Sequence, residues 1–228
     1  GLLWAGGAYA QVVPTVDKEQ QLAIPIVDSL YREDQFYAGV TYNSMLNAPH
    51  ALSQDKFSTG LTVGFLRDVP VNKMRTLAVA AGVGYAYNIY HHNLRTLVEG
   101  DSRTYEIVPD QIDYSTNRTS LHDIDFPIEL RWRNSTFQSH KFWRVYAGVK
   151  ITYNLRNRLF YRGEDQSFEF INNPDVRKWR TGIYLAAGYN TWNVYAYYGI
   201  TPLYDGVKVE GRELKMSALH LGLQFYIL

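Results

Sequence analysis

The feature that most constrains this chain is a strict period-two alternation of apolar and polar side chains. It is clearest over residues 142–156, where every second residue from Trp143 to Leu155 is apolar. The residues between them, beginning with Arg144 and ending with Arg156, are polar, small or charged. Successive side chains of a strand point to opposite faces, so the pattern predicts a β-strand between two very different environments.

The same alternation recurs in seven other segments. The eight predicted strands are residues 35–46, 56–67, 75–91, 119–133, 142–156, 179–189, 192–201 and 218–228. Their connections alternate between long segments and the short turns at residues 68–73, 134–140 and 190–191. An even number of antiparallel strands, with long loops at one end and short turns at the other, is typical of bacterial outer-membrane barrels.

A soluble β-sandwich also alternates, but three features favour a membrane barrel. The predicted strands are longer than the usual five or six residues, and their polar face is rich in glycine, which suits a narrow lumen. Aromatic residues also mark both ends of the apolar face, as in the two girdles of membrane barrels. The girdle at the turn end comprises Trp132, Trp143, Tyr189 and Trp192, and the girdle at the loop end comprises Tyr87, Tyr153 and Trp179. The predicted fold is therefore an all-β, single-domain, eight-stranded antiparallel transmembrane β-barrel over residues 35–228.

Composition excludes several other classes. No apolar run reaches the length of a transmembrane helix. Lys and Arg number 23 against 22 Asp and Glu, a balance that does not favour a nucleic-acid partner. The chain contains no cysteine and no P-loop, zinc-ligand spacing, nucleophile elbow or dinucleotide motif. The sequence thus predicts no catalytic residue, cofactor or metal.

The first residues indicate export. Residues 1–10 resemble the end of an apolar signal peptide and close on Ala8-Tyr9-Ala10, a small-residue cleavage pattern. Residues 11–34 contain Pro14 and Pro25 and are predicted to form an irregular periplasmic segment. We therefore expect both termini of the barrel in the periplasm and the long loops outside the cell.

Charged residues on the polar faces of the fourth, fifth and sixth predicted strands are expected to point into the lumen. They are Asp123, Asp125, Glu129, Arg131, Arg133, Arg144, Lys150, Arg156 and Arg180. Buried charges are costly unless they are paired, so an internal network of ion pairs is the favoured interpretation. The alternatives are a polar path for a small solute and, for the two aspartates, a cation site.

The long connections at residues 93–118 and 157–177 are candidate sites for partner contacts, because function concentrates in such loops. Their aromatic residues are the proposed anchors: Tyr105, Tyr114, Phe160, Tyr161, Phe168 and Phe170. A lipid-acting enzyme is the alternative hypothesis, and it predicts that changes at His91, His92 or His220 abolish activity. In that case His91 and His92 could meet Asp101 or Ser102 of the following loop.

The second half of the chain resembles a known family. Five segments carry the resemblance: Leu130-Arg-Trp-Arg133, Lys141-Phe-Trp-Arg-Val-Tyr-Ala-Gly148, Ala187-Gly-Tyr-Asn-Thr-Trp-Asn193, Tyr197-Tyr-Gly199 and Leu221-Gly-Leu-Gln-Phe-Tyr-Ile-Leu228. They are similar to PorT-like outer-membrane barrels of Bacteroidota, although Leu228 replaces the terminal aromatic residue of proteobacterial barrels. The resemblance implies a non-enzymatic accessory barrel of a protein-secretion assembly, the type IX secretion translocon, with outer-membrane lipid including lipopolysaccharide as its surroundings. A stand-alone porin-like or envelope-stabilising barrel remains an alternative.

Overall fold

A computed structural model of the protein describes most of the barrel region. The described residues are 34–54, 56–72, 74, 76–99, 102–109, 111–134, 143–164, 166–189 and 191–227. The predicted signal remnant at residues 1–10 lies outside them, as does the predicted irregular segment except for its last residue. That residue, Asp34, begins the first strand.

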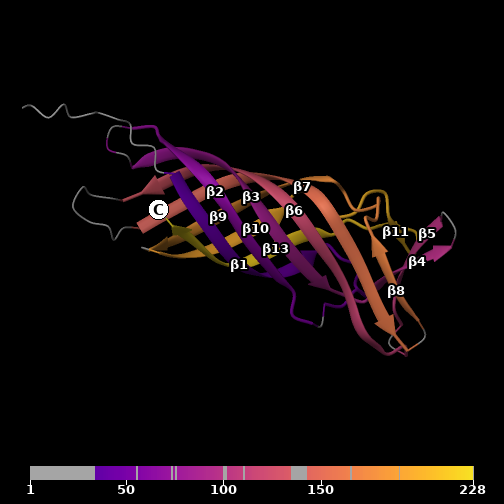
Figure 1. Ribbon diagram of the computed structural model, residues 1–228. Coiled ribbons are helices and arrows are strands. Elements are labelled where there is room, and N and C mark those ends of the chain that lie inside the picture. Colours follow the sequence, from indigo (N-terminus) through magenta and orange to yellow (C-terminus); the bar gives the residue numbers. More distant parts are fainter. Residues whose placement is uncertain are drawn as a thin grey trace, which may run out of the picture. The chain divides into compact units, whose positions relative to one another are not determined.

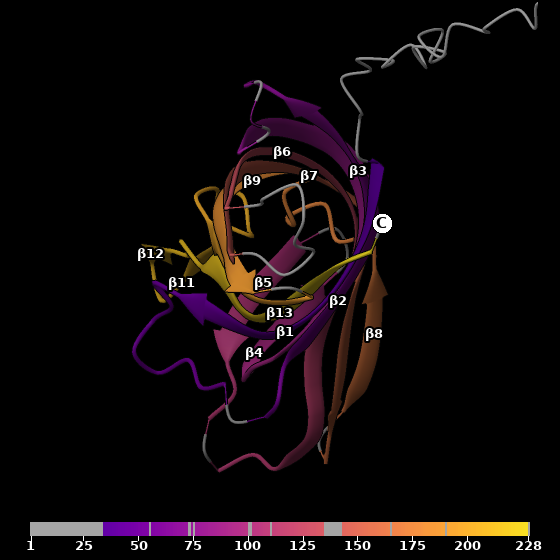
Figure 2. The same ribbon diagram turned by 90° about the vertical axis from the view of Figure 1, so that its left-hand side faces the viewer.

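Eight long strands form a closed antiparallel barrel (Figure 1). They are β1 (Asp34–Leu46), β2 (Thr59–Pro70), β3 (Leu77–His91), β6 (Tyr114–Arg133), β7 (Trp143–Gly163), β9 (Trp179–Tyr189), β10 (Trp192–Gly199) and β13 (Ser217–Ile227). Their order is β6-β3-β2-β1-β13-β10-β9-β7, and pairing of β6 with β7 closes the ring. Figure 2 shows this ring from the turn end. The predicted fold class is confirmed.

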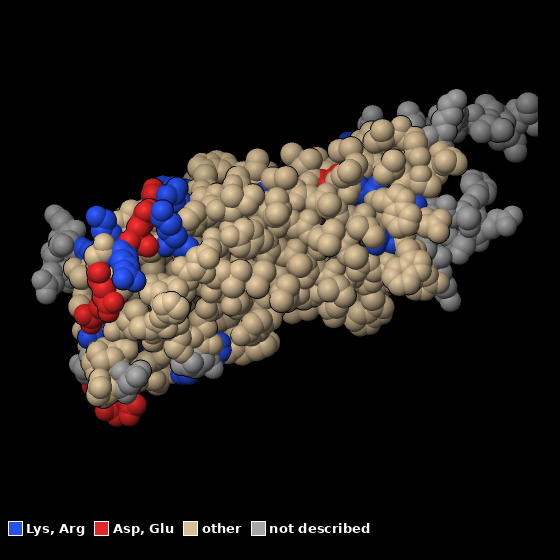
Figure 3. All heavy atoms as spheres, turned by 180° about the vertical axis from the view of Figure 1, so that it is seen from behind, with Lys and Arg blue, Asp and Glu red and all other residues tan. Residues whose placement is uncertain are grey.

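Residues that alternate in the sequence face alternately into the barrel and out of it. Along β3, for example, Ala78 and Ala80 are fully buried, whereas Val79 and Val83 are each more than 40% exposed. Every barrel strand repeats this arrangement over most of its length, so the apolar side chains form the outer surface. Figure 3 shows the result: the middle of the barrel is almost free of charged side chains, which gather toward its two ends.

Additional strands at the loop end extend the structure beyond the ring. β4 (Leu94–Glu99) pairs with β5 (Ser102–Ile107), and β11 (Lys208–Val209) pairs with β12 (Arg212–Glu213). β8 (Ser167–Ile171) pairs with the far end of β7. Much of the two connections predicted as loops is therefore regular β structure, because β6 and β7 continue pairing for 20 and 21 residues.

A β-bulge separates the barrel part of β7 from this extension. Asp123 pairs with Asn154, but the neighbouring His122 pairs with Arg156, so Leu155 is the additional residue. Leu155 and Arg156 both point outward and are exposed, and the alternation resumes with Asn157 buried. The prediction that Arg156 points into the lumen is wrong because the bulge reverses the facing of the strand beyond it.

The connections at the loop end enclose a hydrophobic core of their own. Its buried members are Met45, Tyr90, Leu94, Tyr105, Leu121, Val176, Leu203, Tyr204, Val207, Val209, Leu214 and Met216. They come from five separate stretches of the chain, so this cap, as we name it, is a tertiary structure rather than a set of independent loops. Among the described residues no helix is long and apolar enough to cross a membrane.

Candidate functional site

The barrel interior is filled by tyrosines that lie against glycines. A Cβ atom at Gly84 would lie 2.0 Å from Tyr37 Oη, and one at Gly182 would lie 2.5 Å from Tyr197 Oη. Only a residue without a Cβ leaves space for these rings. Glycines on the inward faces therefore admit large aromatic side chains across the lumen, and they do not open a channel.

The first cluster of lumen charges lies toward the turn end. Arg131 is fully buried and forms an ion pair with Glu129, with 2.7 Å between Nε and Oε2. Asp68, also fully buried, lies 2.9 Å from an amino group of Arg133 and 3.6 Å from one of Arg131. The Arg131 guanidinium also lies 4.7 Å from the centre of the Tyr146 ring. Each charge of this cluster thus has an opposite charge or an aromatic face as its neighbour.

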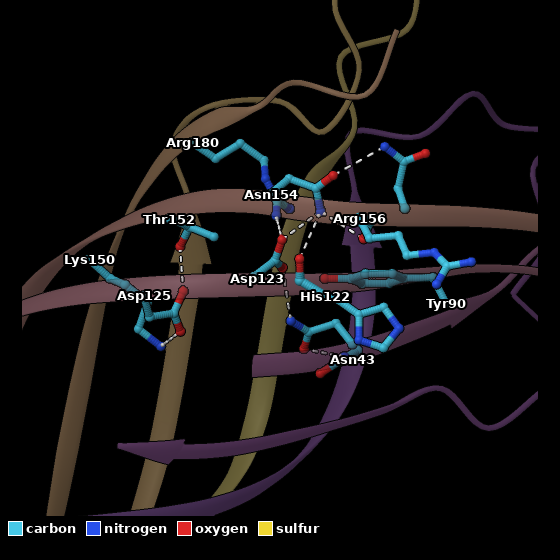
Figure 4. A network of polar contacts seen from close by, with 12 residues as sticks. Asn43, Tyr90, His122, Asp123, Asp125, Lys150, Thr152, Asn154, Arg156 and Arg180 are labelled. Atoms are coloured by element: carbon cyan, nitrogen blue, oxygen red, sulfur yellow. Dashed lines mark hydrogen bonds and ion pairs between the residues drawn. The ribbon is translucent and has the colours of Figure 1, made fainter. Parts of the chain in front are cut away.

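The second cluster lies further toward the loop end (Figure 4). Asp123 forms an ion pair with Arg180 at 2.6 Å and accepts a hydrogen bond from the Asn154 amide at 2.7 Å. Asp125 lies 3.1 Å from the ammonium group of Lys150. The two aspartates point to separate basic partners on β7 and β9, so each carboxylate is neutralised by a side chain. This arrangement supports the ion-pair interpretation rather than the cation site.

Little free space remains between the side chains. The cavity bordered by Asp123, Asp125, Lys150 and Arg180 has a volume of about 20 Å³. A single water molecule requires about 10–15 Å³ by this measure. This cavity therefore holds about one water, and the side chains around it leave no room for a larger solute at this level.

The sequence interpretation missed one member of the charged lumen. Asp68 was assigned to a short turn, but β2 continues to Pro70 and places the Asp68 side chain inside, beside the arginines of β6. The signal was available, since Leu66, Asp68 and Pro70 continue the inward register of β2. Arg144, Arg133 and the other predicted lumen residues apart from Arg156 are buried as expected.

Two aromatic residues proposed as partner contacts are buried instead. Tyr161 is fully buried and stacks on Phe168, with 5.3 Å between ring centres. Tyr105 is 6% exposed and donates a hydrogen bond to Asp175 at 2.9 Å; burial raises its pKa. Tyr105 belongs to the core of the cap, and Tyr161 packs between β7 and β8, so neither offers a contact surface and the prediction is wrong for both. Tyr114, Phe160, Phe168 and Phe170 are partly exposed strand residues.

The histidines do not form a common site. His92 is buried in the cap, where Leu94 N–H donates to its Nδ1 and Thr119 Oγ lies 2.9 Å from its Nε2. Burial lowers the pKa of His92 to about 4. His220 points into the lumen and contacts the Tyr90 hydroxyl at 2.6 Å. Asp101, a suggested partner of His91 and His92, lies outside the described residues, and the described part of the chain contains no cluster suited to holding a metal ion.

The predicted girdle residues form rows across neighbouring strands. At the turn end Trp143, Tyr189 and Trp192 are register partners on β7, β9 and β10, and all are exposed. At the loop end the Tyr153 and Trp179 rings lie 4.7 Å apart on the outer face. Trp132 and Tyr87 also face outward, on β6 and β3.

Comparison with known proteins agrees with this architecture. Residues 10–205 match the family model described as an outer membrane protein beta-barrel domain, which is most of the chain. A search of the curated proteins found no match. The family match and the closed ring with its apolar outer surface lead to the same conclusion. The chain belongs to the family of outer-membrane β-barrel proteins and is a barrel of the bacterial outer membrane.

Proposed function

We propose that this protein is a non-enzymatic accessory barrel of a protein-secretion assembly in the outer membrane. The observation that carries the proposal is the filled interior: paired charges and tyrosines occupy the lumen, and the cavity between Asp123, Asp125, Lys150 and Arg180 has a volume of only about 20 Å³. A barrel with no path through it acts through its surfaces. Those surfaces are its lipid face, the cap and the strands that extend beyond the ring.

The kind of assembly rests on the resemblance to PorT-like barrels of Bacteroidota, several of which serve type IX secretion. That resemblance concerns the second half of the chain, which contributes the strands that extend furthest from the ring. Among the residues that the structure describes, β8 pairs with β7 alone, so its other edge presents backbone groups without a strand partner there. An exposed strand edge can bind a partner by strand addition, which suits a role in an assembly.

The test is gentle detergent extraction of the tagged protein, with mass spectrometry of the proteins that copurify. We expect a large translocon to be recovered with it, and recovery of the barrel alone would refute the accessory role. A Phe170→Ser variant on β8 should reduce recovery of the partners, whereas Arg212→Ser, on the exposed hairpin of β11 and β12, serves as the control.

Orientation can be tested independently because the chain lacks cysteine. We propose that the short turns face the periplasm and the cap faces outward. A membrane-impermeant maleimide should then label Lys208→Cys on intact cells, and should label Asn72→Cys only after the outer membrane is permeabilised. The opposite result would reverse the proposed orientation.

The porin-like alternative makes a different prediction. A conducting barrel gives discrete current steps in a planar bilayer, and the small cavity favours their absence. Reproducible steps at neutral pH would support the porin-like alternative. The lipid-acting enzyme requires an accessible base: of the three candidate histidines, His92 and His220 are buried and His91 is partly exposed.

A further inference from the structure

The strands that extend beyond the ring form an arm with two very different faces. The arm comprises residues 114–122 of β6, 156–163 of β7, and β8, and Figures 1 and 2 show it leaning outward from the ring of strands. Its inner face includes Asn157, Leu159 and Tyr161, each at most 6% exposed. Its outer face carries arginines.

Three of these arginines converge on one aromatic ring. The guanidinium carbons of Arg118, Arg158 and Arg162 lie 5.6, 5.5 and 5.4 Å from the centre of the Phe160 ring. The strand register fixes this convergence, because Arg118 pairs directly with Phe160, while Arg158 and Arg162 flank Phe160 on the same face of β7. Arg156 is exposed on the same face, adjacent to the bulge.

The cluster has an excess of positive charge. Glu169 lies beside it on β8 and forms a two-point ion pair with Arg158, with both contacts at 2.8 Å. Within the described residues, the structure gives Arg118, Arg156 and Arg162 no carboxylate partner, and the buried Nε of Arg118 has no hydrogen-bond partner. The guanidinium groups around Phe160 repel one another. An anion placed between these groups is therefore attracted strongly.

The location of the cluster identifies the anion. On β7 the outer face continues from Tyr153 of the girdle through Arg156 and Arg158 to Arg162. At about 3.3 Å per residue and a strand tilt of about 40°, an arm that continued straight would place Arg156 roughly 8 Å and Arg162 roughly 23 Å beyond the girdle. The outer face of an arm that leans away from the barrel turns toward the membrane surface. The headgroup region adds only about 5–8 Å beyond the hydrocarbon on each side of a bilayer, so the lean of the arm is what brings its arginines toward the lipid headgroups.

We propose that the outer face of the arm binds the phosphate groups of a phosphorylated lipid headgroup in the outer leaflet. Guanidinium groups bind phosphate oxygens in pairs, and Phe160 supplies an apolar surface between the charges. The proposal rests on the proposed orientation, in which the cap faces outward. It assigns the arm a lipid contact, leaving the cap and the edge of β8 for protein partners.

The test compares lipid binding by purified protein in detergent, where orientation in the membrane has no effect. Native mass spectrometry should detect binding of diphosphorylated lipid A, and much weaker binding of its dephosphorylated form. The variant with Arg118, Arg158 and Arg162 changed to Gln should bind about tenfold to a hundredfold less, since each cation near an anionic surface contributes several-fold.

The matched control removes the same number of charges elsewhere at the loop end. Lys208, Arg212 and Lys215 are exposed, and their combined change to Gln should leave lipid A binding unaltered. Equal loss in both variants, or unchanged binding in the arm variant, would overturn the proposal. Inorganic phosphate at the same concentration as lipid A should not displace it. Complete displacement would also overturn the proposal, because the site would then bind free phosphate. The arm variant is checked for folding by its resistance to SDS at room temperature.

Discussion

The buried ion pair of Asp68 offers the sharpest test of the packed lumen. Asp68 and Arg133 lie 2.9 Å apart, and their side chains are 0% and 3% exposed. Replacing Asp68 by Asn keeps the shape but removes the negative charge, which leaves Arg133 without this carboxylate in a site closed to water. Breaking a buried pair from one side costs about 3–5 kcal/mol, so we expect Asp68→Asn to lower the free energy of unfolding by that amount.

An exposed ion pair of the same protein provides the control. Arg177 and Asp205 lie 2.6 Å apart, but their side chains are 34% and 64% exposed. Water screens such a pair, so Asp205→Asn should cost less than about 1 kcal/mol. The double variant Asp68→Asn with Arg133→Gln should recover part of the loss, because no charge is then left without its partner.

Urea unfolding in phospholipid vesicles, followed by tryptophan fluorescence, measures these differences. Trp132, Trp143, Trp179 and Trp192 all lie on the outer face, so their emission reports removal of the barrel from lipid. Equal losses for Asp68→Asn and Asp205→Asn would refute the reasoning, since they would mean that water reaches the lumen pair.

Three further predictions concern the lipid face, the cap and the ring. Val149 is 47% exposed midway between the girdles, so Val149→Arg should cost about 2–4 kcal/mol in the same unfolding assay, and a negligible cost would place this level outside the bilayer. The pKa of His92 is about 4 in the folded protein against 6.5 for a free side chain, so protons favour the unfolded cap as the pH falls below 6.5. The cap should lose about 2 kcal/mol between pH 7 and pH 5, seen as faster hydrogen exchange after correction for the intrinsic rate, and His92→Gln should remove most of this dependence. A Cβ at Gly82 would lie 1.9 Å from the Phe65 carbonyl oxygen, so Gly82→Val should prevent formation of the SDS-resistant barrel, whereas Ala81→Val should permit it.

The barrel itself could be predicted from the sequence because lipid requires apolar side chains on the outer face of every strand, which makes apolar and polar residues alternate. Residues 143–155 alternate without interruption in the sequence, and β7 alternates in the structure over the same range. Beyond Leu155 the sequence reads Arg-Asn-Arg-Leu-Phe-Tyr, which does not alternate and so does not show which side faces inward. The sequence therefore could not predict the bulge at Leu155 or the outward position of Arg156.

The charged interior could be predicted only in part. Asp123, Asp125 and Glu129 alternate with apolar residues of β6, so their inward direction followed from periodicity. Their partners could not be derived, because pairing across a closed ring depends on its diameter and on the stagger of the strands. The cap escaped prediction for a related reason. Its core joins Leu94 to Met216, and such distant contacts leave no local pattern.

The closing seam of the ring has a consequence for biogenesis. β1 pairs with β13 along eleven residue pairs, from Phe36 with Ile227 to Leu46 with Ser217. β1 leaves the ribosome first among the described strands and β13 leaves last, so the seam cannot form until every strand of the barrel has been synthesised and exported. Until then both strands expose unpaired backbone groups that hydrocarbon does not tolerate. We therefore expect the chain to cross the periplasm with both edges open, and to need protection of these edges from hydrocarbon until the seam closes.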